Sequence, residues 1–138
     1  MVDPGRVVEN FLELVRIDSV SGKERKVADL LKNKLSVLGL EVREDNAGRE
    51  IGSDTGNIIG KLPGNGRGPV LLFCAHMDTV EPGRGVKPLL ENGVIKSSGD
   101  TVLGADDKAA IAAILEALRV VRGQNIEHGG LEVVLTIW

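Results

Sequence analysis

The stretch LLFCAHMDTV, residues 71–80, places a histidine and an aspartate directly after an apolar run. Alternate residues of a strand lie on the same face, so we expect His76 and Asp78 to point the same way. An imidazole beside a carboxylate can be a metal ligand with its orienting partner, part of a catalytic triad, or a plain surface pair. A hydrogen-bonded histidine at a strand end explains the same residues without any chemical function.

On both sides of this stretch, segments with apolar residues at helical spacing alternate with segments in which they have the spacing of strands. Helices are predicted from Asp3-Pro4 to about residue 15, from about 22 to 38, and from about 106 to 121. Strands are predicted at 40–44, 57–62, 69–75 and 131–137, with a short hairpin around 93–96 and a polar loop over 44–56. The run 69–75 is apolar on both faces, so we expect it in the middle of the sheet. The pattern predicts the α/β class, with a mixed central β-sheet and helices on both faces.

Composition excludes several functional classes. The chain has 138 residues, a net charge of −3 and only 2% aromatic residues, so no basic or stacking surface for nucleic acid is expected. No apolar run approaches the roughly 20 residues of a membrane span, and none resembles a signal peptide. The single Cys74 cannot form an internal disulfide. These features predict a cytoplasmic protein that binds neither nucleic acid nor membrane.

A second polar group, GADDKAA at residues 104–110, lies at the predicted start of the third helix. Acidic residues at this place commonly cap a helix and complement its dipole. Two adjacent carboxylates exceed what a cap requires, so one of them can point elsewhere, for example at a divalent cation. A carboxylate bridging two metal ions would suit the strand ends, where α/β sheets usually bind ligands.

The other polar candidates have simpler interpretations. His128 precedes the last strand and is expected in a surface loop. Cys74 lies within the apolar strand and is expected to be a small buried hydrophobe. Lys108 is expected to face solvent on the first turn of its helix.

Taken together, FCAHMDTV (73–80) and GDTVLGADDKAAIAAILEAL (99–118) resemble the zinc-dependent co-catalytic exopeptidases of the aminoacylase and carboxypeptidase G2 type. Within that family the chain is most similar to the peptidase T-like, or tripeptide aminopeptidase-like, branch. The resemblance extends along nearly the whole chain, from the two opening helices to the final strand. Either motif alone is moderately specific, and both in this order are strongly so.

The resemblance implies a role for each matching residue. His76 corresponds to a histidine that binds one zinc ion, and Asp106 to the carboxylate that bridges two. Asp78 corresponds to the active-site aspartate that hydrogen-bonds and orients the imidazole. The peptide bond between Asp106 and Asp107 is typically cis in this family. The activity implied is hydrolysis of peptide bonds in small peptides, with two zinc ions that activate a water.

The chain departs from the family pattern at its end. In the family, the strand matching LEVVLTIW (131–138) is followed by a Glu pair, of which one is the general base and one a zinc ligand. Further ligands and a lid or dimerisation domain are also without counterparts. We therefore expect residues 1–138 to be the N-terminal part of a single catalytic domain, inactive by itself. We also expect 131–137 to be an inner strand whose bare edge or face makes a homo-oligomer possible.

Two other functions stay open. One is a deacylase of N-acyl amino acids or other small amides. The other is a non-catalytic α/β binding domain, in which His76 and Asp78 form a surface pair and the two adjacent aspartates cap a helix.

Overall fold

The computed structural model describes all residues 1–138. The helices are α1 (Pro4–Val15), α2 (Arg25–Val37), α3 (Ala47–Ile51) and α4 (Ala105–Gly123). The strands are β1 (Glu41–Glu44), β2 (Ile58–Pro63), β3 (Leu71–His76), β4 (Pro88–Glu91), β5 (Val94–Ser97) and β6 (Gly130–Thr136). None of the helices is both long and apolar enough to span a membrane.

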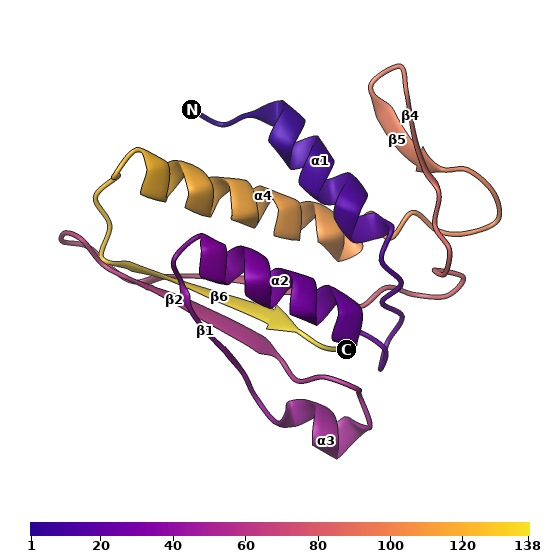
Figure 1. Ribbon diagram of the computed structural model, residues 1–138, viewed down its shortest axis with the longest axis horizontal. Helices are drawn as coiled ribbons and strands as arrows, with labels where there is room; N and C mark the ends of the chain where they lie inside the picture. Colours follow the sequence, from indigo (N-terminus) through magenta and orange to yellow (C-terminus); the bar gives the residue numbers. More distant parts are fainter.

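The main sheet has the strand order β1-β2-β6-β3, and β4 and β5 form a separate hairpin (Figure 1). Strand β6 runs antiparallel to β2 and parallel to β3, so the sheet is mixed. The prediction that the last strand is an inner one is confirmed. The bare edge expected of that strand is not found, because β6 is hydrogen-bonded to a strand on each side. The prediction that 69–75 is central is wrong, because β3 pairs only with β6 and forms an edge of the sheet.

The helices α1, α2 and α4 lie on one face of the main sheet (Figure 1). Leu131, Val133 and Leu135 of β6 are buried in one core together with Leu35 of α2 and Leu115 of α4. The α/β class and the mixed sheet are therefore confirmed. Helices cover one face of the sheet in these residues rather than both, because α2 and α4 pack into the same core.

The opposite face of the sheet carries the alternate residues of each strand. Leu72 on this face is 60% exposed, and Cys74 is exposed as well. The prediction that Cys74 is a buried hydrophobe is therefore wrong. Its strand is apolar on both faces, but helices of the described chain cover only one of them.

The packing of α1 on α4 is fixed by a buried carboxylate. Asp3 caps α1 by accepting hydrogen bonds from the backbone N–H groups of Gly5 and Arg6. Glu116 of α4, only 1% exposed, accepts two bonds from the Arg6 guanidinium, at 2.7 and 3.0 Å, and one from the Asp3 backbone N–H at 2.8 Å. The hydrogen bond from Arg6 is the main cause that lowers the pKa of Glu116 to about 2.

Candidate functional site

His76 is the last residue of β3, at the carboxyl end of the parallel pair β3 and β6. Its Nδ1 atom lies 3.0 Å from Asp78 Oδ1 and 3.0 Å from the Asp78 carbonyl oxygen. Both oxygens accept hydrogen bonds, so they favour the tautomer with its proton on Nδ1. The Nε2 lone pair is then available to a ligand. The prediction that these two side chains point the same way is confirmed.

Asp78 is held from a second direction. Its side chain is largely buried, and its other oxygen, Oδ2, accepts a hydrogen bond from the Ser21 hydroxyl at 2.6 Å. Ser21 lies in the loop between α1 and α2, 57 positions away in the sequence. Reasoning from the sequence missed Ser21, because no local pattern links it to the strand end.

Asp106 approaches His76 from the start of α4. Its Oδ1 atom lies 3.1 Å from His76 Nε2, although 30 positions separate the two residues. The backbone of Asp106 has φ −89° and ψ 107°, outside the helical region, and the peptide bond to Asp107 is cis. The Asp106 side chain is 95% exposed and bonds His76 rather than a backbone N–H of α4. Helix capping therefore does not account for this carboxylate.

The two carboxylates determine the charge state of the imidazole. Partial burial of the ring lowers the pKa of His76, but hydrogen bonds to Asp106 and Asp78 outweigh burial and raise that pKa above its ordinary value. Both ring nitrogens face acceptor oxygens, so the protonated ring satisfies them both. A metal ion on Nε2 would replace one of these protons.

The donor pair fits a zinc ion in chemistry and in spacing. A tetrahedral site with bonds of about 2.0–2.1 Å places two ligand atoms about 3.3 Å apart, and imidazole nitrogen and carboxylate oxygen are both usual zinc ligands. The observed separation of 3.1 Å between His76 Nε2 and Asp106 Oδ1 is close to this value. Residues 1–138 contain no group of three or more His, Cys, Asp or Glu suited to a metal. Two donors would leave further coordination positions to other groups.

A cavity of about 350 Å³ adjoins this pair, between the end of β3 and the start of α4. Its lining residues are His76, Asp78, Thr79, Val80, Val102, Leu103, Gly104, Ala105 and Asp106. The buried hydroxyl of Thr79 has no hydrogen-bond partner. A small ligand could therefore lie against both carboxylates while contacting apolar side chains.

Lys108 contradicts the prediction that it faces solvent. It is only 2% exposed, and its Nζ atom donates a hydrogen bond to the Ile17 carbonyl oxygen at 2.8 Å. Burial lowers the pKa of Lys108 to about 8, against an opposing effect of the Asp18 charge. The prediction assumed regular helix from residue 106 onward. The backbone at Asp106 and Asp107 is not helical, so Lys108 faces a different direction from the one that helical spacing predicts.

His128 lies far from this site along the sheet. It occupies the loop between α4 and β6, as predicted, although it is half-buried there. The loop leads into the amino end of β6, whereas His76 lies beside Thr136 near the carboxyl end. The two histidines therefore cannot share one ligand.

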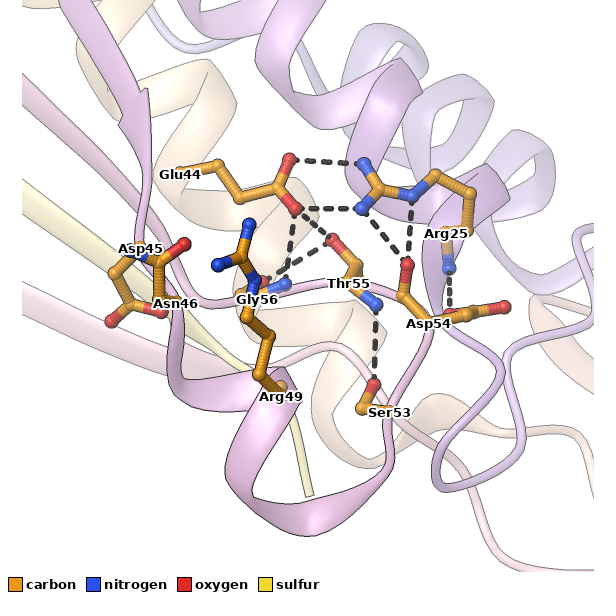
Figure 2. A pocket seen from close by; sticks show the side chains of 10 residues that line it. Arg25, Glu44, Asp45, Asn46, Arg49, Ser53, Asp54, Thr55 and Gly56 are labelled. Atoms are coloured by element: carbon orange, nitrogen blue, oxygen red, sulfur yellow. Dashed lines mark hydrogen bonds and ion pairs between the residues drawn. The ribbon is translucent and has the colours of Figure 1, made fainter.

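A second cavity, of about 200 Å³, is polar and lies near α3 (Figure 2). At its wall Glu44 accepts hydrogen bonds from Arg25 at 2.6 and 2.9 Å, from Thr55 at 3.0 Å and from the Gly56 backbone at 3.1 Å. These partners, the Arg25 guanidinium above all, hold the pKa of Glu44 far below its usual range. Glu44 also accepts from Lys32 at 2.9 Å, and Arg25 also donates to Asp29 at 3.2 Å. The charges of Glu44 and Arg25 are therefore satisfied within the protein, and we assign this network to the folding of segment 44–56.

The mixed α/β fold of this chain matches solved structures of peptidases. The chain belongs to peptidase family M28, whose family model matches residues 57–138, more than half of the chain.

Three relatives show how far the similarity extends. The protein YqjE of Bacillus subtilis (strain 168) is 47% identical over 137 residues, which are 99% of this chain and 37% of that protein. Crystal structures of a tripeptidase from Staphylococcus aureus and of the aminopeptidase PepT from Bacillus cereus each superpose with a TM-score of 0.95 at 42% identity. Each match covers 99% of this chain and 37% of the solved chain. The chain thus spans little more than a third of the length of these relatives.

Proposed function

We propose that the protein containing this chain is a zinc-dependent peptidase that hydrolyses small peptides, as an aminopeptidase or tripeptidase. One observation carries the proposal: His76 Nε2 lies 3.1 Å from Asp106 Oδ1 while Asp78 engages the other ring nitrogen. If His76 and Asp78 were only a surface pair and Asp106 only a helix cap, nothing would require His76 and Asp106 to meet across 30 positions of sequence. The similarity to a tripeptidase and to an aminopeptidase supports the substrate class.

In this proposal each residue has a separate task. His76 would bind one zinc ion through Nε2, and Asp106 would bridge that ion and a second one. Asp78 accepts a hydrogen bond from the His76 Nδ1–H group, which holds the ring orientation and makes Nε2 a better metal ligand. When bound, the two ions would supply a Lewis acid for the scissile carbonyl and lower the pKa of a water.

We further propose that residues 1–138 form the N-terminal part of one catalytic domain. The general base and the remaining ligands would then lie in other parts of the protein, as the family resemblance implies. Residues 1–138 by themselves would be inactive, because two donors leave a catalytic zinc site incomplete. A cytoplasmic location and association between copies stay predictions.

Zinc binding by the full-length protein tests the proposal. We expect His76→Ala and Asp106→Asn each to weaken zinc binding by more than about 100-fold, beyond the 10–100-fold loss typical of outer-shell partners. Tripeptide hydrolysis should be lost with the metal. His128→Ala is the matched control, because it removes a histidine at the other end of the sheet and should change neither property.

A substrate panel separates the remaining alternatives. Hydrolysis of N-acetyl amino acids but not of tripeptides with a free amino end would identify a deacylase and refute the peptidase proposal. A full-length protein that binds no zinc and cleaves neither class would support the non-catalytic binding domain.

A further inference from the structure

The loop between α1 and α2, residues 16–24, runs alongside the strand end that carries His76 and Asp78. Val20 forms a parallel bridge with Thr79, and the Thr79 backbone N–H donates to the Ser19 carbonyl oxygen at 2.9 Å. The buried Ser19 hydroxyl donates to the Met77 carbonyl oxygen at 2.9 Å. These contacts fix the position of this loop against residues 77–79.

From this fixed loop, Ser21 reaches the carboxylate of Asp78. A carboxylate accepts and does not donate, so the 2.6 Å contact is a hydrogen bond from the Ser21 hydroxyl to Asp78 Oδ2. Its length lies within the 2.5–2.7 Å that is typical of a hydroxyl bonded to a charged oxygen. The other oxygen, Oδ1, faces His76 Nδ1. Both oxygens are therefore engaged, and the carboxylate cannot rotate without breaking a bond.

We propose that Ser21 is a positioning residue, which acts through Asp78 to hold the His76 ring in the tautomer and orientation that present Nε2 to Asp106. This inference rests on the proposed metal site for its consequence in function. Without the hydroxyl, Asp78 Oδ2 keeps no hydrogen-bond partner within the protein, and the carboxylate is free to turn. The bond from Nδ1 to Oδ1 would then loosen, and on that side of the ring only the Asp78 backbone carbonyl oxygen, at 3.0 Å, would still accept from Nδ1. The ring would be confined less tightly to one orientation.

The same loop is also attached to α4, which carries Asp106. The buried Lys108 donates to the Ile17 carbonyl oxygen, four positions before Ser21. One loop thus touches both sides of the candidate site, β3 through Ser21 and α4 through Lys108. This arrangement ties the loop that carries Ser21 to the helix that carries Asp106.

The test compares Ser21→Ala with Ser21→Thr in the full-length protein. Ser21 is exposed, so the added methyl group of threonine has room and its hydroxyl can restore the bond. Ser53→Ala is the matched control, because the Ser53 hydroxyl donates to another carboxylate, Glu24 Oε2, at 2.9 Å. We expect Ser21→Ala to weaken Zn²⁺ binding about 10-fold, at the lower end of outer-shell effects. Ser21→Thr and Ser53→Ala should bind Zn²⁺ as the unmodified protein does.

A second readout does not depend on metal binding. In metal-free protein labelled with ¹⁵N-histidine, at a pH where the ring is neutral, His76 should carry its proton on Nδ1. Ser21→Ala should shift the two ring nitrogens toward a mixture of tautomers, and Ser21→Thr should restore the original signals. Unchanged His76 signals in Ser21→Ala would overturn the proposal, as would equal loss of Zn²⁺ affinity in Ser53→Ala. An unmodified protein that binds no Zn²⁺ would refute the metal site, and the imidazole signals would still decide the role of Ser21.

Discussion

Four side chains form a continuous hydrogen-bonded line through the candidate site. The Ser21 hydroxyl bonds Asp78 at 2.6 Å, Asp78 bonds His76 at 3.0 Å, and His76 bonds Asp106 at 3.1 Å. The line begins in a loop, passes through the end of β3 and finishes at the start of α4. The geometry of the donor pair therefore depends on backbone positions in three separate segments.

Gly104, two residues before Asp106, is one of those backbone positions. It has φ +73°, and a Cβ atom there would lie 3.0 Å from Thr79 Cγ2. We expect Gly104→Ala to lower the free energy of unfolding by about 1–2 kcal/mol, the usual cost of a left-handed conformation for an L-residue. We also expect weaker zinc binding, because Asp106 would be displaced from His76. Chemical denaturation and zinc titration measure the two effects.

Gly123→Ala is the control for this substitution. Gly123 lies at the end of α4 without a positive φ, and a Cβ atom there would meet nothing within 4 Å. Alanine should be neutral or slightly stabilising at this position. Equal effects of the two glycine substitutions would contradict the account of Gly104.

One part of this site could be predicted from residue spacing in the sequence alone. His76 and Asp78 are two positions apart in an extended segment, so their shared direction follows from strand geometry. The expectation that Asp106 lies near them rested on its place at a helix start close to the strand ends, and on the family resemblance. Ser21 and Lys108 could not be predicted, because their partners lie 57 and 91 positions away and no periodic pattern records such contacts.

At the scale of elements, the bond between α1 and α4 predicts a pH dependence. The pKa of Glu116 is about 2 in the folded chain and 4.5 in its ordinary state. The stabilising effect of this carboxylate is therefore complete above pH 4.5 and is lost as the pH falls from 4.5 toward 2. We expect Glu116→Gln to lower the unfolding temperature by roughly 4 °C at neutral pH. It should also make that temperature less sensitive to acid.

Glu41→Gln provides the comparison for that measurement. Glu41 is exposed on β1 and forms no ion pair. The substitution should therefore leave the fall of the unfolding temperature in acid unchanged. If the unfolding temperature fell equally steeply with acid in Glu116→Gln and in the unmodified chain, the bonds of Glu116 to α1 would not be the cause of the acid sensitivity.

Periodicity predicted most elements but not their neighbours in space. The helices α1, α2 and α4 and the strand β6 have clear apolar patterns or caps, and they occur where expected. Strand β3 was expected at the centre because both of its faces are apolar, yet it lies at an edge. Helix α3 was not predicted, because its sequence AGREI is short and has no apolar stripe. Its surroundings are fixed by the distant Arg25, which bonds both Glu44 and the Asp54 carbonyl oxygen.

At the scale of the whole molecule, the uncovered face of the sheet predicts association. Leu72 is 60% exposed there, next to the exposed Cys74 on an edge strand. Exposed apolar side chains and an open strand edge both favour contact with another chain, although the ion pair between Lys61 and Glu132 lies beside Leu72 on this face. We expect the 138-residue chain by itself to self-associate in sedimentation, and Leu72→Lys to shift it toward monomer.

Leu89→Lys is the control for association. Leu89 is exposed on β4, in the separate hairpin, so the same change of charge there should leave the association intact. A monomeric 138-residue chain at high concentration would contradict the prediction, and so would equal dissociation by both lysine variants.

The proposed function requires that His76 and Asp106 bind the same metal ion. Anomalous diffraction at the zinc absorption edge, from crystals of the full-length protein grown with zinc, tests this claim most directly. We expect a zinc peak about 2.0–2.2 Å from both His76 Nε2 and an Asp106 carboxylate oxygen. A zinc peak elsewhere, or His76 and Asp106 still hydrogen-bonded to each other with no peak between them, would contradict it.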